Sequence, residues 1–155
     1  MKHIHFLLSA LVASSTILSL SPRAQAQTTP SVTSLSGTYV GTYTCGQGLT
    51  NLRLVIDAKS QNQINAVFNF SANESNPFVP SGSFRMVGTY KNSTAKKGGL
   101  LTLRGTTWIK RPKNYVTVNL SANVVLPAFG IAGNVTGNRA CTTFDVVREI
   151  FKTQP

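Results

Sequence analysis

The sequence predicts an all-β domain folded as an eight-stranded antiparallel up-and-down barrel, and three observations support this prediction. Apolar residues recur at every second position in short runs, as they do in half-buried strands. Gly, Asn and Ser clusters separate these runs, and none of the runs has a convincing helical period. Two cysteines fall at the same end of the first and last runs if successive strands alternate in direction. The alternative is a two-sheet β-sandwich, which also brings first and last strands together.

Eight candidate strands follow one another along the chain, and short turn sequences join them. They cover residues 37–45, 52–57, 64–70, 84–90, 100–104, 115–120, 129–135 and 141–148. The one helix-like stretch, Asp145 to Lys152, contains Val146, Val147 and Ile150, which favour a strand that frays into a polar tail at residues 151–155.

The inward positions of these strands are almost all apolar, which predicts a filled core. The expected inward residues are Leu52, Leu54, Ile56, Phe68, Phe70, Phe84, Met86, Val116, Val118 and Ile131. A cavity among such residues would suit an apolar molecule, so a carrier of a small apolar ligand is one alternative function.

The N-terminus has the pattern of a secretory signal peptide. Met1-Lys2 begins a basic segment, residues 4–20 are mostly apolar, and Ala24-Gln25-Ala26 matches the small-x-small cleavage pattern. We therefore expect a signal peptide over residues 1–26, a flexible leader over 27–35, and a single barrel domain over 36–150. Cleavage near Ala26 would make the protein secreted or periplasmic.

The two cysteines outside the signal peptide, Cys45 and Cys141, predict one disulfide in an oxidising compartment. A disulfide needs Cα atoms within roughly 7 Å of each other. In an open sheet the first and eighth strands would lie far apart, whereas in a closed barrel they are neighbours. The cysteine pair therefore favours closure of the sheet.

Candidate catalytic and metal-ligating residues are scarce. Both histidines, His3 and His5, lie in the predicted signal peptide, so the mature chain lacks the commonest catalytic base. We expect no enzyme, no catalytic residue, no cofactor and no metal site. Glu74 and Asp145 leave a carboxylate-dependent hydrolase as an alternative, because two carboxyl groups can act as acid and base.

The strongest candidate for binding is the segment from Trp108 to Tyr115, which Pro112 keeps from being regular strand. Aromatic rings offer stacking faces, and lysine and arginine contact phosphate or carboxylate groups. We predict a site for an anionic glycan, a lipid headgroup or a protein partner, formed by Trp108, Lys110, Arg111, Lys113, Tyr115 and Arg139. The alternative is that Trp108 plugs the end of the barrel while the cations only solvate a loop.

The net charge of +11 bears on the partner class. A second basic cluster, formed by Lys91, Lys96 and Lys97, is expected at the barrel end opposite Trp108. Charge divided between two ends argues against dedicated nucleic-acid binding. Most predicted strands are shorter than membrane-spanning strands and the aromatic residues form no two belts, so we do not expect a transmembrane protein.

Two sets of residues resemble known families. Gly37-Thr38-Tyr39 is similar to the early Gly-x-Trp of avidin-type and lipocalin-type barrels, with tyrosine in place of tryptophan. A second resemblance is to an uncharacterised family of small secreted bacterial β-domains. It rests on Tyr43-x-Cys45-x-Gln47-Gly48, Trp108-Ile109-x-x-Pro112-x-x-Tyr115 and Cys141-x-x-Phe144. The resemblance implies a β-fold unit and carries no known activity.

Overall fold

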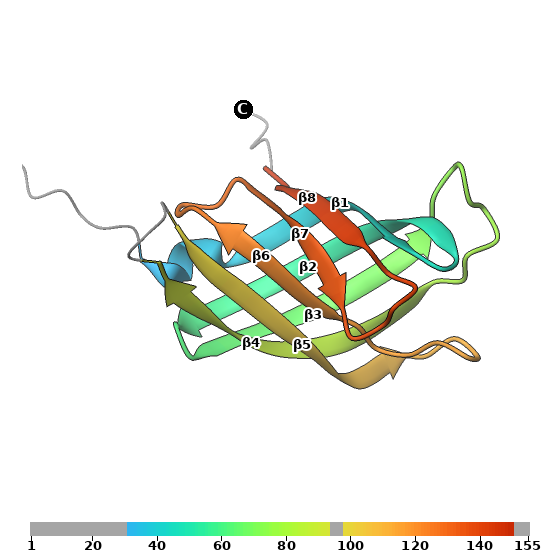
Figure 1. The fold of residues 1–155 in the computed structure, drawn as a ribbon, viewed down its shortest axis with the longest axis horizontal. Helices are drawn as coiled ribbons and strands as arrows, with labels where there is room; N and C mark the ends of the chain where they lie inside the picture. The colour runs from blue at the N-terminus through green and yellow to red at the C-terminus, as the bar shows by residue number, and fades with distance from the viewer. Residues whose placement is uncertain (1–30, 94–97, 151–155) are drawn as a thin grey trace, which may run out of the picture.

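The computed structural model describes residues 31–93 and 98–150, which form a closed antiparallel barrel (Figure 1). Each strand pairs with the next one along the chain, and the last pairs with the first. The up-and-down barrel is thus confirmed, and the two-sheet sandwich is excluded. The strands are β1 (Gly37–Cys45), β2 (Gly48–Ser60), β3 (Gln63–Ala72), β4 (Gly82–Asn92), β5 (Gly99–Lys110), β6 (Asn119–Val124), β7 (Gly130–Thr136) and β8 (Thr143–Arg148).

The barrel closes along a seam between β1 and β8, where Tyr39 pairs with Arg148 and Tyr43 pairs with Phe144. The predicted disulfide between Cys45 and Cys141 is present just beyond the Tyr43 end of this seam. It joins the last residue of β1 to the connection that precedes β8. Segments almost a hundred residues apart are therefore covalently linked where the ring closes.

The core fills the barrel as the alternating pattern predicts. On β2, Leu52, Leu54 and Ile56 face inward and are buried, while Arg53 and Asp57 between and beyond them are exposed. Nine of the ten residues expected to face inward are buried. The exception is Val116, which is 56% exposed, so its predicted inward position is wrong.

The error at Val116 reflects a misplaced strand. The β-branched and aromatic residues of 115–118 favour a strand locally, but β6 begins only at Asn119. Asn114 has a positive φ of 66°, and the Tyr115 backbone N–H donates to the Pro112 carbonyl. This turn keeps residues 115–118 in the connection between β5 and β6, and the inward face of β6 is formed by Leu120, Ala122 and Val124.

Strand β5 is longer than predicted and carries an irregularity. Met86 of β4 lies opposite Gly105, whereas Phe84 lies opposite Trp108, so β5 has one more residue than β4 between these pairs. Such a bulge shifts the alternation of inward and outward side chains. Trp108 therefore packs against the buried Phe84 although the preceding inward residues of β5 have odd numbers.

The two ends of the barrel differ. The end that we call the base is covered by a short 3-10 helix, Val32–Leu35, whose Leu35 is fully buried. The sequence predicts a flexible leader over residues 27–35. This is wrong for residues 32–35, because they form the 3-10 helix and the Leu35 side chain packs into the core. The predicted signal peptide, residues 27–30 and the tail at 151–155 lie outside the described residues.

Arg148 completes the base. Its guanidinium donates hydrogen bonds to the carbonyl oxygens of Ala128 and Ser36, both at 2.8 Å, and it also bonds to the Tyr39 hydroxyl. The guanidinium carbon lies 4.9 Å from the centre of the Tyr39 ring. Tyr39, from the Gly-x-Tyr segment, is completely buried. Leu35, Tyr39 and Arg148 consequently fill the base of the barrel.

Candidate binding site

The end opposite the base, which we call the mouth, contains a cavity of about 250 Å³. The connections β1–β2, β3–β4, β5–β6 and β7–β8 all lie at this end (Figure 1). Aromatic and aliphatic side chains form the floor, and amides and a phenol contribute polar groups. The lining residues are Tyr43, Cys45, Gln47, Phe68, Phe70, Phe84, Asn114, Tyr115, Val116, Val118, Asn138 and Cys141.

A hydrogen-bonded polar group marks one wall of the cavity. Gln47, in the tight turn after β1, donates its side-chain N–H to the Tyr43 hydroxyl at 2.9 Å and to the Thr50 hydroxyl at 3.3 Å. Burial raises the pKa of the Tyr43 phenol above that of a free tyrosine, and the nearby Tyr115 raises it further. Hydrogen bonds from Gln47 and Thr50 oppose this increase in pKa only in part. Tyr43 therefore presents a neutral hydroxyl to the cavity.

An aromatic cluster adjoins this polar group, since the Tyr43 ring meets Phe70 edge-on with ring centres 6.4 Å apart. Phe70 stacks on Tyr115 with ring centres 5.4 Å apart, and meets Trp108 edge-on at 6.4 Å. Trp108 also packs edge-on against Phe84 at 5.2 Å. Because each ring packs against a neighbouring ring, this cluster is preorganised, and its side chains do not move independently of one another.

The six residues predicted to bind are not all brought together. Tyr115 lines the cavity, and Trp108 lies directly behind its Phe70 and Phe84 walls. Trp108, Ile109 and Lys110 belong to β5 and not to a loop as the sequence predicts, because the bulge lets β5 continue to Lys110. Trp108 is half-buried, so it both packs against the core and supports the mouth.

The cations lie at the rim of the mouth or outside it. Arg111 sits over the Trp108 ring, 5.9 Å from its centre, and donates to the Tyr115 carbonyl at 3.1 Å. Lys113 and Arg139 are exposed next to the cavity-lining Asn114 and Asn138. Lys110 instead lines a separate outer groove together with Arg53. Three of the four cations predicted to bind, namely Arg111, Lys113 and Arg139, therefore lie at the rim.

The two carboxylates of the hydrolase alternative do not line the cavity. Glu74 is exposed in the β3–β4 connection, and Asp145 is exposed on the outer face of β8. Asp145 borders a different outer groove, which also includes Thr42 and Thr143. The mouth cavity thus contains no pair of acids among its lining residues.

Several cavity residues were not predicted as binding residues, above all Tyr43, Gln47 and Asn138. Tyr43 stands two positions before Cys45, which places both on the inward face at the mouth. The residues quoted for the small secreted β-domain resemblance lie around this same end, from Tyr43 and Gln47 to Trp108 and Tyr115. The sequence could have indicated these binding residues only if the ends of the strands had been known, because their clustering at the mouth depends on where each strand ends.

We compared the chain with protein-family models, with curated proteins and with solved structures. None of them matches it. No helix within residues 31–93 and 98–150 is long and apolar enough to cross a lipid bilayer.

Proposed function

We propose that this domain is a non-enzymatic binding module that takes the apolar or planar part of an anionic ligand into the mouth cavity. The observation that carries the proposal is a cavity with aromatic walls and a basic rim at the mouth, the end of the disulfide-closed barrel opposite the 3-10 helix. Ligand sites in proteins are typically concave, mostly apolar and furnished with a few polar groups that orient the ligand. The mouth has each of these properties.

The size of the cavity limits what can enter it. An engineered apolar cavity of about 150 Å³ holds one benzene molecule. The mouth cavity of about 250 Å³ therefore has room for a group of roughly two fused rings. Phe68, Phe70 and Val118 would contact the apolar faces of such a group.

Polar groups would fix the orientation of the ligand. The neutral hydroxyl of Tyr43 and the amides of Asn114 and Asn138 border the cavity and can form hydrogen bonds with a polar substituent. Arg111 and Arg139 would attract an acidic group that remains at the rim, since charge-assisted hydrogen bonds are stronger than neutral ones. An anionic aromatic or amphiphilic molecule satisfies both parts of the site.

We further propose that the domain works outside the cytoplasm, as a secreted or periplasmic protein. The disulfide is compatible with such a location, because disulfides persist in oxidising compartments. The signal-peptide pattern at residues 1–26 supports the same proposal.

Binding of 1-naphthoate, a two-ring carboxylate, tests the proposal by isothermal titration calorimetry. We expect one saturable site in the wild-type protein. Val116→Trp should weaken binding at least tenfold, because Val116 lines the cavity and is 56% exposed, so a larger ring can occupy the cavity without entering the core. Val125→Trp is the matched control, because Val125 is 58% exposed in the β6–β7 connection, at the base.

A second comparison tests the role of the rim cations. The double substitution Arg111→Ala and Arg139→Ala should weaken naphthoate binding while leaving the binding of neutral 1-naphthalenemethanol within twofold. The proposal is overturned if naphthoate does not bind, or if Val116→Trp binds as well as the wild type.

A further inference from the structure

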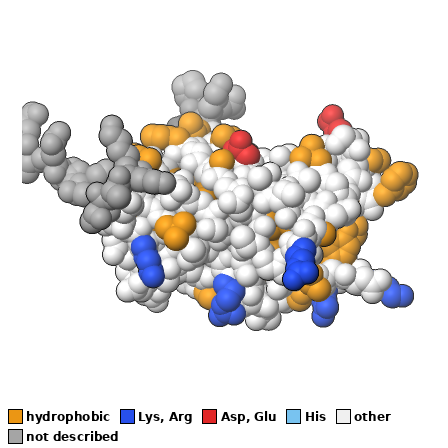
Figure 2. Space-filling model, viewed as in Figure 1, with side chains coloured by type: hydrophobic (Ala, Val, Ile, Leu, Met, Phe, Trp, Pro, Cys, Tyr) orange, Lys and Arg blue, Asp and Glu red, His pale blue; other side chains and the backbone are white. Residues whose placement is uncertain are grey.

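Acidic and basic residues are unevenly distributed along this chain. All four acidic residues lie outside residues 75–144, a segment that carries more than half of the 15 lysines and arginines. On the face drawn in Figure 2, the visible lysine and arginine side chains lie in the lower half of the molecule, and the visible acidic side chains lie near its upper edge. The separation gives the barrel one strongly positive face.

This face is formed mainly by the outer surface of the β4–β5 hairpin. Arg85 and Lys91 of β4 are exposed and alternate with the buried Phe84, Met86 and Tyr90. Arg104 and Lys110 of β5 are exposed as well. We call these four cations the basic strip: Arg85, Lys91, Arg104 and Lys110.

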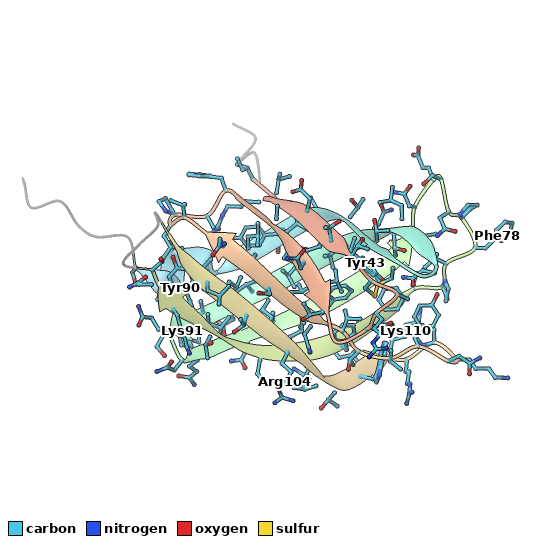
Figure 3. All side chains as sticks on the ribbon, in the orientation of Figure 1. Tyr43, Phe78, Tyr90, Lys91, Arg104 and Lys110 are labelled. Atoms are coloured by element: carbon cyan, nitrogen blue, oxygen red, sulfur yellow. A yellow bond between two sulfur atoms is a disulfide. The ribbon has the colours of Figure 1, made fainter. Side chains whose placement is uncertain are left out.

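The register of the hairpin orders the basic strip along the barrel. Arg104 lies opposite Val87, and Lys110 lies opposite Ser83. Proceeding from the base to the mouth, the order is therefore Lys91, Arg104, Arg85 and Lys110. At about 3.3 Å per residue, the eight positions between the levels of Lys91 and Ser83 span roughly 26 Å. Figure 3 shows Lys91, Arg104 and Lys110 spread along this length. The sequence predicts positive charge at the two ends of the barrel, whereas in the structure Arg85 and Arg104 lie between them.

The basic strip is not neutralised by neighbouring carboxylates. Within the described part of the chain, the ion pairs are Arg53 with Glu149 at 3.5 Å and Lys59 with Asp57 at 3.0 Å. Both pairs involve β2, and neither includes a residue of β4 or β5. Uncompensated charges along one face produce a positive potential that attracts polyanions.

A groove of about 620 Å³, lined by both polar and apolar side chains, adjoins Arg104 and indicates which kind of polyanion fits. Hydroxyl and amide side chains make up much of its lining, and Thr89 and Thr102 are hydrogen-bonded to each other at 3.1 Å. The polar groups are those of Asn62, Thr89, Thr102, Arg104, Asn119, Ser121 and Thr136. Such a lining can form many hydrogen bonds with sugar hydroxyl groups.

The same face lacks what a single-stranded nucleic acid needs. Proteins that bind single strands combine basic grooves with exposed aromatic rings on which bases stack. The aromatic residues of β4 and β5 are Phe84, Tyr90 and Trp108, and each packs against the core. The outward apolar residues are aliphatic, for example Val87 and Leu100.

We propose that the basic strip and its adjoining groove bind a linear acidic polysaccharide, whose carboxylate or sulfate groups repeat along the chain. The polymer lies along the hairpin, with its acidic groups on the cations and its hydroxyl groups in the groove. This surface is separate from the mouth cavity and does not depend on the function proposed for it.

Fluorescence anisotropy with a labelled heparin octasaccharide tests this inference. Arg85→Ser combined with Arg104→Ser should weaken binding at least tenfold, and raising the salt from 50 to 300 mM should weaken wild-type binding by a similar factor. Lys59→Ser combined with Arg139→Ser is the matched control, since it removes the same number of charges from outside β4 and β5 and should change affinity less than twofold. Val116→Trp should also leave this binding unchanged, which separates the strip from the mouth.

Three outcomes overturn the proposal. The first is equal loss of binding in the control and hairpin variants, because net charge alone would then explain it. The second is tighter binding of a labelled thymidine 20-mer or of vesicles containing phosphatidylglycerol than of the octasaccharide. The third is an octasaccharide affinity that does not change with salt.

Discussion

Removal of the disulfide should cost this barrel a large part of its stability. Cys45 and Cys141 are separated by 96 positions, so the bridge constrains a loop that includes most of the domain. In the chain-entropy model, a loop of this length lowers the entropy of the unfolded state by an amount equivalent to about 4.7 kcal/mol at 25 °C. Domains of this size are typically stable by only about 5–15 kcal/mol.

Urea unfolding followed by the fluorescence of Trp108, the single tryptophan, measures this effect. We expect the variant Cys45→Ala with Cys141→Ala to lose about 4–5 kcal/mol in the free energy of unfolding. For a slope of about 1.5 kcal/mol per M, the midpoint should fall by about 3 M urea. Wild-type protein unfolded in the presence of dithiothreitol is the control, because it breaks the bridge without changing the side chains.

A loss of less than about 1 kcal/mol in both the variant and the reduced wild type would contradict this prediction. Such a result would mean that the unfolded chain already keeps the two cysteines close together, or that the seam is equally stable without its covalent link. A large loss in the variant together with none in the reduced protein would instead implicate the alanine side chains.

Three further predictions concern the base, the phenols and the register. Arg148→Lys keeps the charge but loses the forked donors to the Ala128 and Ser36 carbonyls, so unfolding in urea should show a loss of about 2 kcal/mol; a loss below 0.5 kcal/mol contradicts the role of Arg148. Burial raises the pKa of Tyr43, as it does for the other core tyrosines, so the unfolded state releases its phenol protons first. Stability should be full below pH 10 and decrease as the pH rises further, less steeply in Tyr43→Phe, and a pH-independent midpoint between pH 9 and 11 contradicts this. Leu101→Ala should cost about 2–5 kcal/mol, whereas Leu100→Ala, 41% exposed, should cost below 1 kcal/mol; equal losses would mean that β5 is in the wrong register.

The local sequence pattern was sufficient to predict much of the barrel. The alternation of apolar and polar residues identifies β2, β3 and β4, because one face of each strand is buried and the other is exposed. Closure followed from the positions of Cys45 and Cys141, since a disulfide requires the first and last strands to be adjacent. These features depend on residues close in sequence or on a covalent constraint.

Features that depend on pairing between strands were not predictable in the same way. The bulge in β5 arises because Gly105 and Trp108 match positions of β4 that are only two residues apart. The start of β6 was displaced because residues 115–118 have strand-forming side chains, while the turn at Asn114 holds them in a connection. Arg148 gave no sign of its role, because its partners Ser36 and Ala128 are remote in sequence.

The seam between β1 and β8 links stability to the proposed site. Every other strand pair joins consecutive strands, whereas this one pairs the first strand with the last. It is held by the disulfide at the mouth and by Arg148 at the base, and the mouth cavity is lined from both sides of it, by Tyr43 and Cys45 and by Asn138 and Cys141. Opening of the seam at the mouth would therefore separate the cavity walls before the rest of the barrel unfolds. A ligand in the cavity binds only the closed seam, so it should protect the disulfide from reduction, and reduction should in turn weaken the binding of naphthoate.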